Sequence, residues 1–366
     1  MSTMTWRERL RGISFQTKLL VIVNIILVLA FAASALGLHA VSSSFETVTA
    51  ARRFGGESAI RFAQLACFFP AGEEKTEEEI FGIRQSLESK FVEQSLTAPE
   101  GGSLFIDAYS ASAAVSVSTD HANAQVSALG VGGNFFYFHP LRLRSGVYIA
   151  ERDLMDDLVV LDEALAWRLF GGVELTGMTL YINGAPFVVA GVVAMEDDFA
   201  TERALEQEGS LFLSYSALQR LDENLSIDCY EIVMPDPISG YARGVMEQLF
   251  PLGEESIVEN SGRFFIARLF EVIGDFGDRS MRTTAVVYPY WENALRFAED
   301  CAALLLVLAV FTALFPLATL TVLVVLGCRA LWHRTKCAAA ARFADAVERH
   351  KEKRYSRLTA KDTEGE

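Results

Sequence analysis

Two long apolar runs divide the chain into three parts. Residues 19–40 and 302–326 contain no Asp, Glu, Lys or Arg, and each reaches the roughly 20 residues that a helix needs to cross a bilayer. Other apolar runs, such as 158–161 and 187–193, are of strand length only. The pattern predicts two transmembrane helices, at 19–40 and 302–327, with residues 41–300 held between them.

The first apolar run also resembles the hydrophobic part of a signal peptide. Basic residues precede it and small residues occur near Ala32–Ala35, as they do at a cleavage site. However, the run is longer than the roughly 7–15 apolar residues of a signal peptide. We therefore expect an uncleaved membrane anchor.

Charge is distributed unevenly between the flanks and the middle. Residues 1–18 carry a net charge of +3 and residues 329–366 carry +4. The whole chain carries −15, so the segment between these flanks carries −22. Positive flanks stay in the cytoplasm. We expect a cytoplasmic N-terminus (1–18), an extracytoplasmic domain (41–300) and a cytoplasmic, helical tail (328–366) in the plasma membrane. The acidic middle argues against binding nucleic acid.

The middle segment mixes strand and helix patterns, which predicts an α+β domain. Its clearest part is 158–194: a strand at 158–161, a helix capped by Asp162 and stopped by Gly171 and Gly172, and two strands joined by an Asn183-Gly184 turn. Residues 42–69 favour a mostly helical stalk and 130–134 a glycine-rich loop. A helix from about residue 290 is expected to run unbroken into the second span.

Several residues of the first span suit contacts between helices in the membrane. Asn24 is a polar residue within the apolar run, and such residues can form hydrogen bonds across helices. The pairs Ala30/Ser34 and Ala33/Gly37 place small residues four apart, which permits close helix approach.

Signals for catalysis or metal binding are weak. There is no HExxH, GxSxG or phosphate-loop motif, and no Cys spacing typical of zinc. We expect no enzymatic activity, no cofactor and no metal. Cys67 and Cys229 lie in the acidic middle, where either a disulfide or two separate buried thiols fits the sequence.

One stretch resembles a known family. Residues 158–193 read LVVLDEALAWRLFGGVELTGMTLYINGAPFVVAGVV, which is similar to the core of the MacB-like periplasmic domain found in ABC transporter permease subunits of the macrolide-exporter and lipoprotein-release type. The matching residues are Val160, Leu161, Glu163, Ala164, Leu165, Ala166, Leu169, Phe170, Gly171, Gly172, Gly177, Leu180, Gly184, Phe187, Val189, Gly191 and Val192. Phe135, Phe136, Pro140, Leu141 and Gly146 also fit the family pattern.

The resemblance implies a two-lobed domain in which a middle segment, about 120–225, is inserted into a lobe built from both chain ends. It also implies a role in transport, with an ATP-hydrolysing subunit as partner. Family permeases carry three spans after this domain, whereas this chain shows one span and a charged tail, and it has no Walker A motif.

Two functions remain open at this stage. The first is an accessory or divergent permease-type subunit that works with an ABC ATPase and a full permease in the lipid bilayer. The alternative is a two-span extracytoplasmic sensor that signals through a partner protein. The sequence leaves homo-oligomer formation open.

Overall fold

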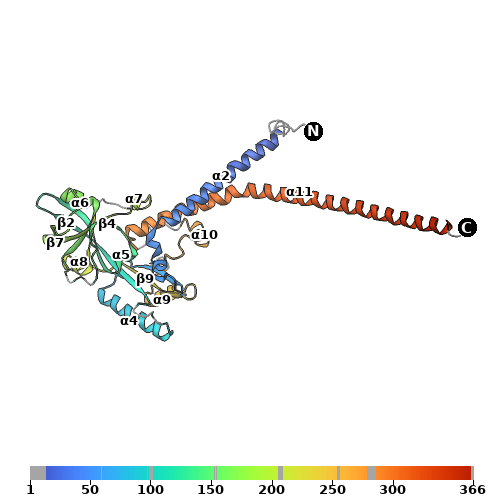
Figure 1. Ribbon diagram of the computed structural model, residues 1–366. Coiled ribbons are helices and arrows are strands. Elements are labelled where there is room, and N and C mark those ends of the chain that lie inside the picture. Colours follow the sequence, from blue (N-terminus) through green and yellow to red (C-terminus); the bar gives the residue numbers. More distant parts are fainter. Residues whose placement is uncertain are drawn as a thin grey trace. The chain divides into compact units, whose positions relative to one another are not determined.

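The computed structural model describes residues 14–363 except 59, 97, 99–101, 152, 154, 205–208, 254–255 and 278–285, with backbone alone at 352–363. The chain divides into two compact units (Figure 1). Residues 37–306 form a domain, and the described parts of 1–36 and 307–366 form a helical unit.

The domain is built on one ten-stranded sheet. Its order is β10-β1-β9-β2-β3-β8-β5-β7-β4, and β6 pairs with both β2 and β7. The strands are β1 (Phe62–Phe68), β2 (Ile106–Ser118), β3 (Asn123–Gly133), β4 (Arg142–Gly146), β5 (Leu158–Asp162), β6 (Thr179–Ile182), β7 (Ala185–Ala194), β8 (Ser210–Ser214), β9 (Cys229–Pro235) and β10 (Ile257–Glu259).

Strands from different parts of the chain occupy different halves of this sheet. β1, β9, β10 and β2 form one half, and β3 to β8, all between residues 123 and 214, form the other. The antiparallel β2–β3 pair joins them, in register from Ala108↔Gly133 to Ser118↔Asn123. The predicted α+β class is confirmed, and the two halves of the domain share one continuous sheet.

Helices cover both faces of the sheet. The described helices are α2 (Phe15–Ser43), η1 (Glu46–Thr49), α3 (Ala50–Gly55), α4 (Glu77–Glu93), α5 (Phe135–Phe138), α6 (Glu163–Phe170), α7 (Thr201–Ala204), α8 (Tyr215–Leu221), α9 (Tyr241–Leu249), α10 (Ile266–Gly274) and α11 (Tyr290–Thr363). Residues of α4, α6, α8 and α9 share one buried cluster with the sheet. Residues of α3, α5 and the first turn of α11 share a second cluster, with alternate residues of the same strands.

The segment 158–194 folds as its sequence predicts. Asp162 caps α6 by accepting a hydrogen bond from the Leu165 N–H at 2.6 Å, and Gly171 ends the helix in the left-handed conformation. Asn183 and Gly184 both have positive φ, as the tight turn between β6 and β7 requires. Local signals were sufficient here because each lies within a few residues of the element that it starts or stops.

Two expectations about other segments are wrong. The helical stalk ends early, because residues 62–68 form β1, an internal strand paired with β9 and β10. Residues 130–133 belong to β3 rather than to a loop. Gly132 lies opposite Tyr109 of β2, and a Cβ at Gly132 would lie 2.1 Å from Cζ of that ring. Glycine is therefore needed to make room for the tyrosine ring.

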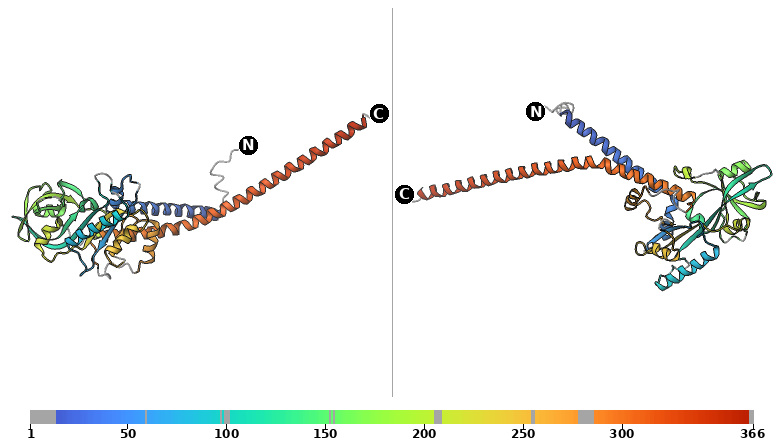
Figure 2. Two further views of the ribbon diagram at one scale, coloured as in Figure 1. Left: turned by 90° about the horizontal axis from the view of Figure 1, so that it is seen from below. Right: turned by 180° about the vertical axis from the view of Figure 1, so that it is seen from behind.

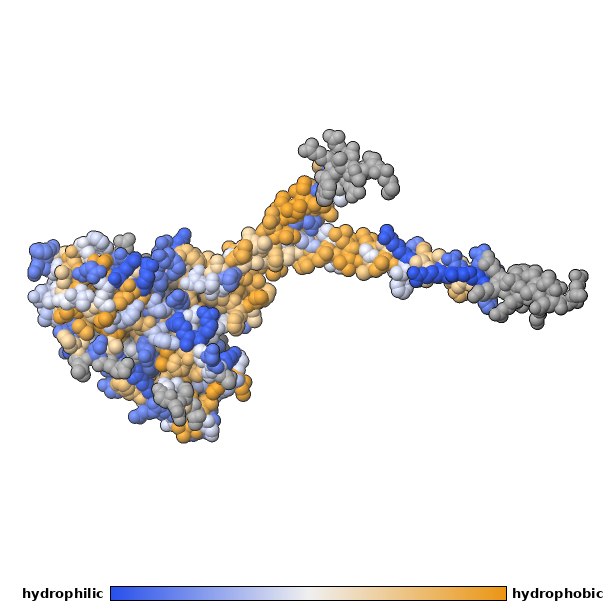
Figure 3. All heavy atoms as spheres, in the orientation of Figure 1, coloured by the Kyte–Doolittle hydropathy of each residue, from blue (hydrophilic) through white to orange (hydrophobic). Residues whose placement is uncertain are grey.

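Within the described residues, α2 and α11 are the two helices long and apolar enough to cross a membrane. The run 19–40 lies inside α2, and the run 302–326 lies inside α11. Apolar side chains cover both helices along these runs (Figure 3). α11 continues from Tyr290 through Pro316 without a break, which confirms the predicted continuous helix.

Candidate coupling site where the second long helix leaves the domain

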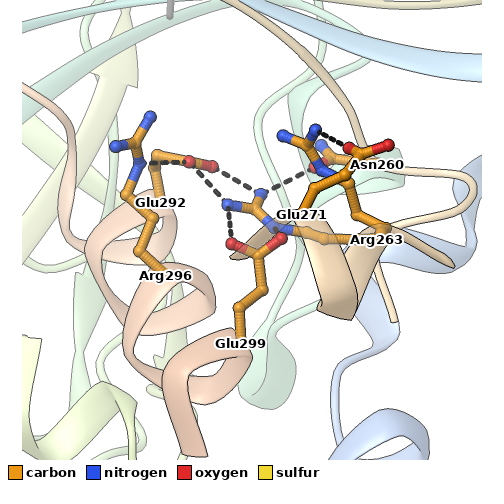
Figure 4. Close-up of polar contacts among 7 residues, drawn as sticks. Asn260, Arg263, Glu271, Glu292, Arg296 and Glu299 are labelled. Atoms are coloured by element: carbon orange, nitrogen blue, oxygen red, sulfur yellow. Dashed lines mark hydrogen bonds and ion pairs between the residues drawn. The ribbon is translucent and has the colours of Figure 1, made fainter. Parts of the chain in front are cut away.

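A buried ionic cluster fixes the start of α11 to the domain (Figure 4). Arg263, in the loop between β10 and α10, donates from Nη1 to Glu292 Oε2 at 2.7 Å and from Nη2 to Glu292 Oε1 at 2.6 Å. Its Nε lies 3.0 Å from Glu299 Oε1, and Nη1 also donates to Asn260 Oδ1 at 2.8 Å. Arg296 donates from Nε to Glu292 Oε1 at 2.8 Å. One guanidinium thereby holds two carboxylates of α11.

The charges of this cluster balance in a buried environment. Two arginines face two glutamates, and Arg263, Glu292 and Glu299 are all buried. Burial alone would raise the pKa of Glu292, but the Arg263 and Arg296 guanidinium groups lower that pKa below its ordinary value. Burial opposes the charge on Arg263, and the two glutamates raise its pKa above the ordinary value. Glu292 and Arg263 therefore both favour their charged forms. Removing one partner of this cluster would leave a buried charge unpaired.

An aromatic group packs the same helix turn against the sheet. The Trp291 ring lies 4.6 Å from the His139 ring and 5.8 Å from the Phe135 ring, centroid to centroid. His139 Nε2 lies 2.5 Å from Glu231 Oε2 of β9. Trp291, His139 and Glu231 are all buried. A movement of this helix turn would therefore displace His139, which contacts Glu231 of the internal strand β9.

A second set of hydrogen bonds connects the exit of α2 to the same place. The buried Gln64 of β1 accepts a hydrogen bond from Ala50 N at 3.0 Å and donates to Thr47 O at 2.6 Å. Its backbone carbonyl accepts from Asn260 N at 2.8 Å, and Asn260 in turn binds Arg263. The segment after α2 and the start of α11 are thus linked through one strand of the sheet.

The membrane residues singled out from the sequence lie in different surroundings. Asn24 donates from Nδ2 to Leu20 O of its own helix at 2.8 Å. Ser34 is buried and donates to Ala30 O at 2.9 Å, whereas Ala33 is exposed. Gly37 faces the other long helix, since a Cβ there would lie 3.3 Å from the Leu305 side chain. Whether these residues mediate contacts in a bilayer stays a prediction.

Cys67 and Cys229 lie on neighbouring strands but are not bonded. Cys67 pairs with Tyr230, and Phe68 pairs with Cys229. The two thiols are one position apart along the strands, so they belong to the clusters on opposite faces of the sheet. Both are free and buried, and burial raises the pKa of each thiol. Of the two possibilities left open by the sequence, the structure shows separate buried thiols.

A cleft of about 620 Å³ opens beside α10, between α3 and the start of β1. Arginines line it together with Glu259 and Glu271. Arg61 pairs with Asp236, and Arg268 pairs with Glu271 at 2.6 Å. Much of the positive charge at the cleft is therefore already balanced by the domain's own acids.

Sequence reasoning found the long helix but not the cluster at its start. Glu292 and Glu299 are seven residues apart, so they lie on one face of the helix two turns apart. Leu295 lies on the same face, and acids that share a helix face with an apolar residue indicate buried charge. Their partner Arg263 lies 29 residues before Glu292, and no local pattern identifies it.

Comparisons with known proteins find a matching family model and several similar solved structures. The sequence model of the MacB-like periplasmic core domain matches residues 24–237. A comparison with curated protein sequences finds no match. Solved structures that resemble the chain include the periplasmic region of MacB from Actinobacillus actinomycetemcomitans, with 19% identity over 64% of this chain and 99% of that one, at a TM-score of 0.39. The extracellular domain of the noncanonic ABC-type transporter YknZ from Gram-positive bacteria shows 14% identity over 54% and 99%, at 0.37.

Proposed function

The chain belongs to the MacB-like periplasmic core domain family, and we propose that it is a non-enzymatic, permease-type subunit of an ABC-type transport or mechanotransmission complex. Its domain is the periplasmic domain of ABC-type transporter permease-like proteins. We further propose that the chain transmits motion across the membrane to this domain, which contacts a partner or substrate outside.

The observation that carries this proposal is the single helix α11. It begins within the buried ionic cluster and continues through the whole apolar run 302–326. Between Tyr290 and Pro316 the helix can transmit an axial or tilting displacement, because its backbone hydrogen bonds run along the axis. Pro316 removes one of these bonds farther along the run. The buried ion pairs with Arg263 oppose separation of that helix from the domain. A shift of the span would therefore pull on the loop 260–263 and on β9.

The expected surroundings follow from charge and family. The flanks with net charges of +3 and +4 favour both termini in the cytoplasm and residues 41–300 outside. The lipid bilayer then surrounds 19–40 and 302–327. An ABC ATPase would supply the energy on the cytoplasmic side, and a full permease subunit would complete the membrane path.

The direct test is affinity purification of the full tagged chain from its native host in a mild detergent, followed by mass spectrometry. We expect an ABC ATPase and a multi-span permease in the eluate. A tagged, unrelated two-span protein from the same host serves as the control. Recovery of the chain alone would contradict the proposal, and recovery with a kinase would favour the two-span sensor.

Deletion of residues 337–366 separates these two readings further. A sensor must pass its signal through its cytoplasmic part, so loss of the tail should abolish its output. Unchanged function of the truncated chain would contradict the sensor.

A further inference from the structure

The short helix α10 (Ile266–Gly274) packs against the domain-side ends of both apolar runs. Leu269 is buried in one cluster with Ala302 and Leu306 of α11, and Leu38 of α2 packs against that cluster. Figure 2 shows α10 beside the beginning of α11. All of these residues belong to the same compact unit. One side of α10 is thus buried against the domain-side ends of the two predicted spans.

A second apolar surface at α10 is exposed in the part of the domain that the structure describes. Ile266 is 59% exposed and Phe270 54%, and Phe276, just after the helix, is 64% exposed. Ile266 and Phe270 are four residues apart, so they lie one above the other on the helix flank. Ile266, Phe270 and Phe276 are called the α10 apolar patch below.

The charged residues of α10 lie on the other flank. Arg268 and Glu271 pair with each other at 2.6 Å and are both exposed. By helical spacing they lie away from the flank that Ile266 and Phe270 occupy. The helix therefore has an apolar side wider than the stripe that the domain buries, and a polar side that faces water.

The position of α10 beside the start of the second apolar run indicates that the bilayer covers the patch. The run 302–326 is about 37 Å long at 1.5 Å per residue, which exceeds the roughly 30 Å of hydrocarbon in a bilayer. A run centred in the bilayer would extend a few Å beyond the hydrocarbon at each end, so its first turns, where Ala302 and Leu306 contact the α10 cluster, would lie near the boundary with the interfacial layer. Helices with one apolar and one charged side lie in this layer with the apolar side toward the acyl chains.

We propose that α10 is an interfacial membrane helix, and that its apolar patch (Ile266, Phe270, Phe276) inserts into the domain-side leaflet of the bilayer. Arg268 and Glu271 are the two charged residues in the sequence of α10 and pair with each other, so the helix has no net charge, and the middle segment of the chain carries −22. The occupant is therefore the apolar edge of a zwitterionic leaflet, bound by burial of apolar side chains. This anchor would fix the height of the domain above the membrane. It depends on neither an ATPase nor a transported molecule.

The test uses the full chain in nanodiscs of phosphatidylcholine, with or without bromine on the acyl chains. Phe270→Trp adds a fluorophore in the patch, and Tyr181→Trp adds one at an exposed site of β6. The wild-type signal from the native tryptophans is subtracted. We expect brominated lipid to quench the added fluorescence of F270W about twofold or more, because the patch lies at the acyl boundary. The fluorescence added by Y181W should remain unchanged.

Equal fluorescence of F270W in brominated and plain lipid would overturn the proposal, and would place the patch in water or against protein, such as a partner or a second copy. If F270W does not fold, Phe276→Trp repeats the test from outside the helix. High salt provides a second check. Quenching that persists at 1 M salt supports apolar insertion, whereas quenching lost at that concentration would contradict it, because charge attraction is screened there.

Discussion

Arg263 shows how one side chain can join parts of the chain that are distant in sequence. Its planar guanidinium binds Glu292 through two nitrogens, a fork geometry that lysine cannot reproduce. Glu299 forms an ion pair with the same guanidinium, 3.0 Å from Nε, and accepts a hydrogen bond from Nη2 at 3.4 Å. Buried ion pairs of this kind do not guarantee a gain in stability over an apolar core, but they make the loss of one member costly. The cluster therefore favours one position of α11 on the domain.

Glu292→Gln should destabilise the domain, because it leaves the buried charge of Arg263 partly unpaired. The expected loss is about 3–5 kcal/mol, which corresponds to a fall of roughly 5–15 °C in the melting midpoint. Thermal unfolding of the full chain in detergent, followed by tryptophan fluorescence, measures it. Glu271→Gln is the matched control, because its pair with Arg268 is exposed and worth at most about 1 kcal/mol. Equal midpoints for the two variants would contradict a structural role for the cluster.

Asp228 gives a prediction that depends on pH. Burial raises its pKa to about 6, although Ser112 donates hydrogen bonds to the carboxylate. Because the pKa in the unfolded chain is about 3.9, the folded state binds the proton more tightly, and this group reduces stability as the pH rises from about 4 to 6. Asp228→Asn should therefore raise the melting midpoint at pH 7.5 and change it little at pH 4. A midpoint gain of the same size at both pH values would exclude this explanation.

At the scale of single elements, the sequence predicted an element correctly when the residues that determine it lie close to it in the sequence. α6 and the β6–β7 turn were predicted from Asp162, Gly171 and Asn183, which act on their immediate neighbours. β1 was missed because its partners β9 and β10 lie about 165 and 195 residues away. α10 was also missed, because it is short and part of its apolar surface remains uncovered by the domain. The coupling site required contacts that no local pattern contains.

The β2–β3 pair, which joins the two halves of the sheet, offers a test at this scale. Gly132→Ala should lower stability, since the new methyl group would overlap the Tyr109 ring. That ring is fixed by the hydrogen bond from its hydroxyl to Glu77 Oε1 at 2.5 Å. We expect a loss of about 1–3 kcal/mol, as for other overpacked sites.

Gly82→Ala in the exposed part of α4 is the matched control. An added Cβ there meets no atom within 4 Å, so alanine should stabilise the helix by about 0.5–1 kcal/mol. Chemical denaturation of the full chain compares the two variants. A neutral or stabilising Gly132→Ala would show that β2 and β3 do not pack as described.

On the scale of the whole chain, α11 is one continuous element that runs from the domain into the second apolar run. Its first turns are held in the domain by Glu292, Glu299 and Trp291, and its later turns contain the apolar run 302–326. Coupling between two sites requires an element whose position both sites influence. α11 meets this condition, because the domain fixes its start and a partner in the membrane would contact its middle.

The most direct test of this coupling is hydrogen exchange, measured by mass spectrometry on the full chain purified with its ATPase partner, with and without a non-hydrolysable ATP analogue. We expect nucleotide to change the exchange of backbone amides in 257–275 and 290–301. Four glycines inserted between Cys301 and Ala302 should abolish this change while the complex still forms. Exchange in both segments that is indifferent to nucleotide in the wild-type complex would contradict the transmission of motion through α11.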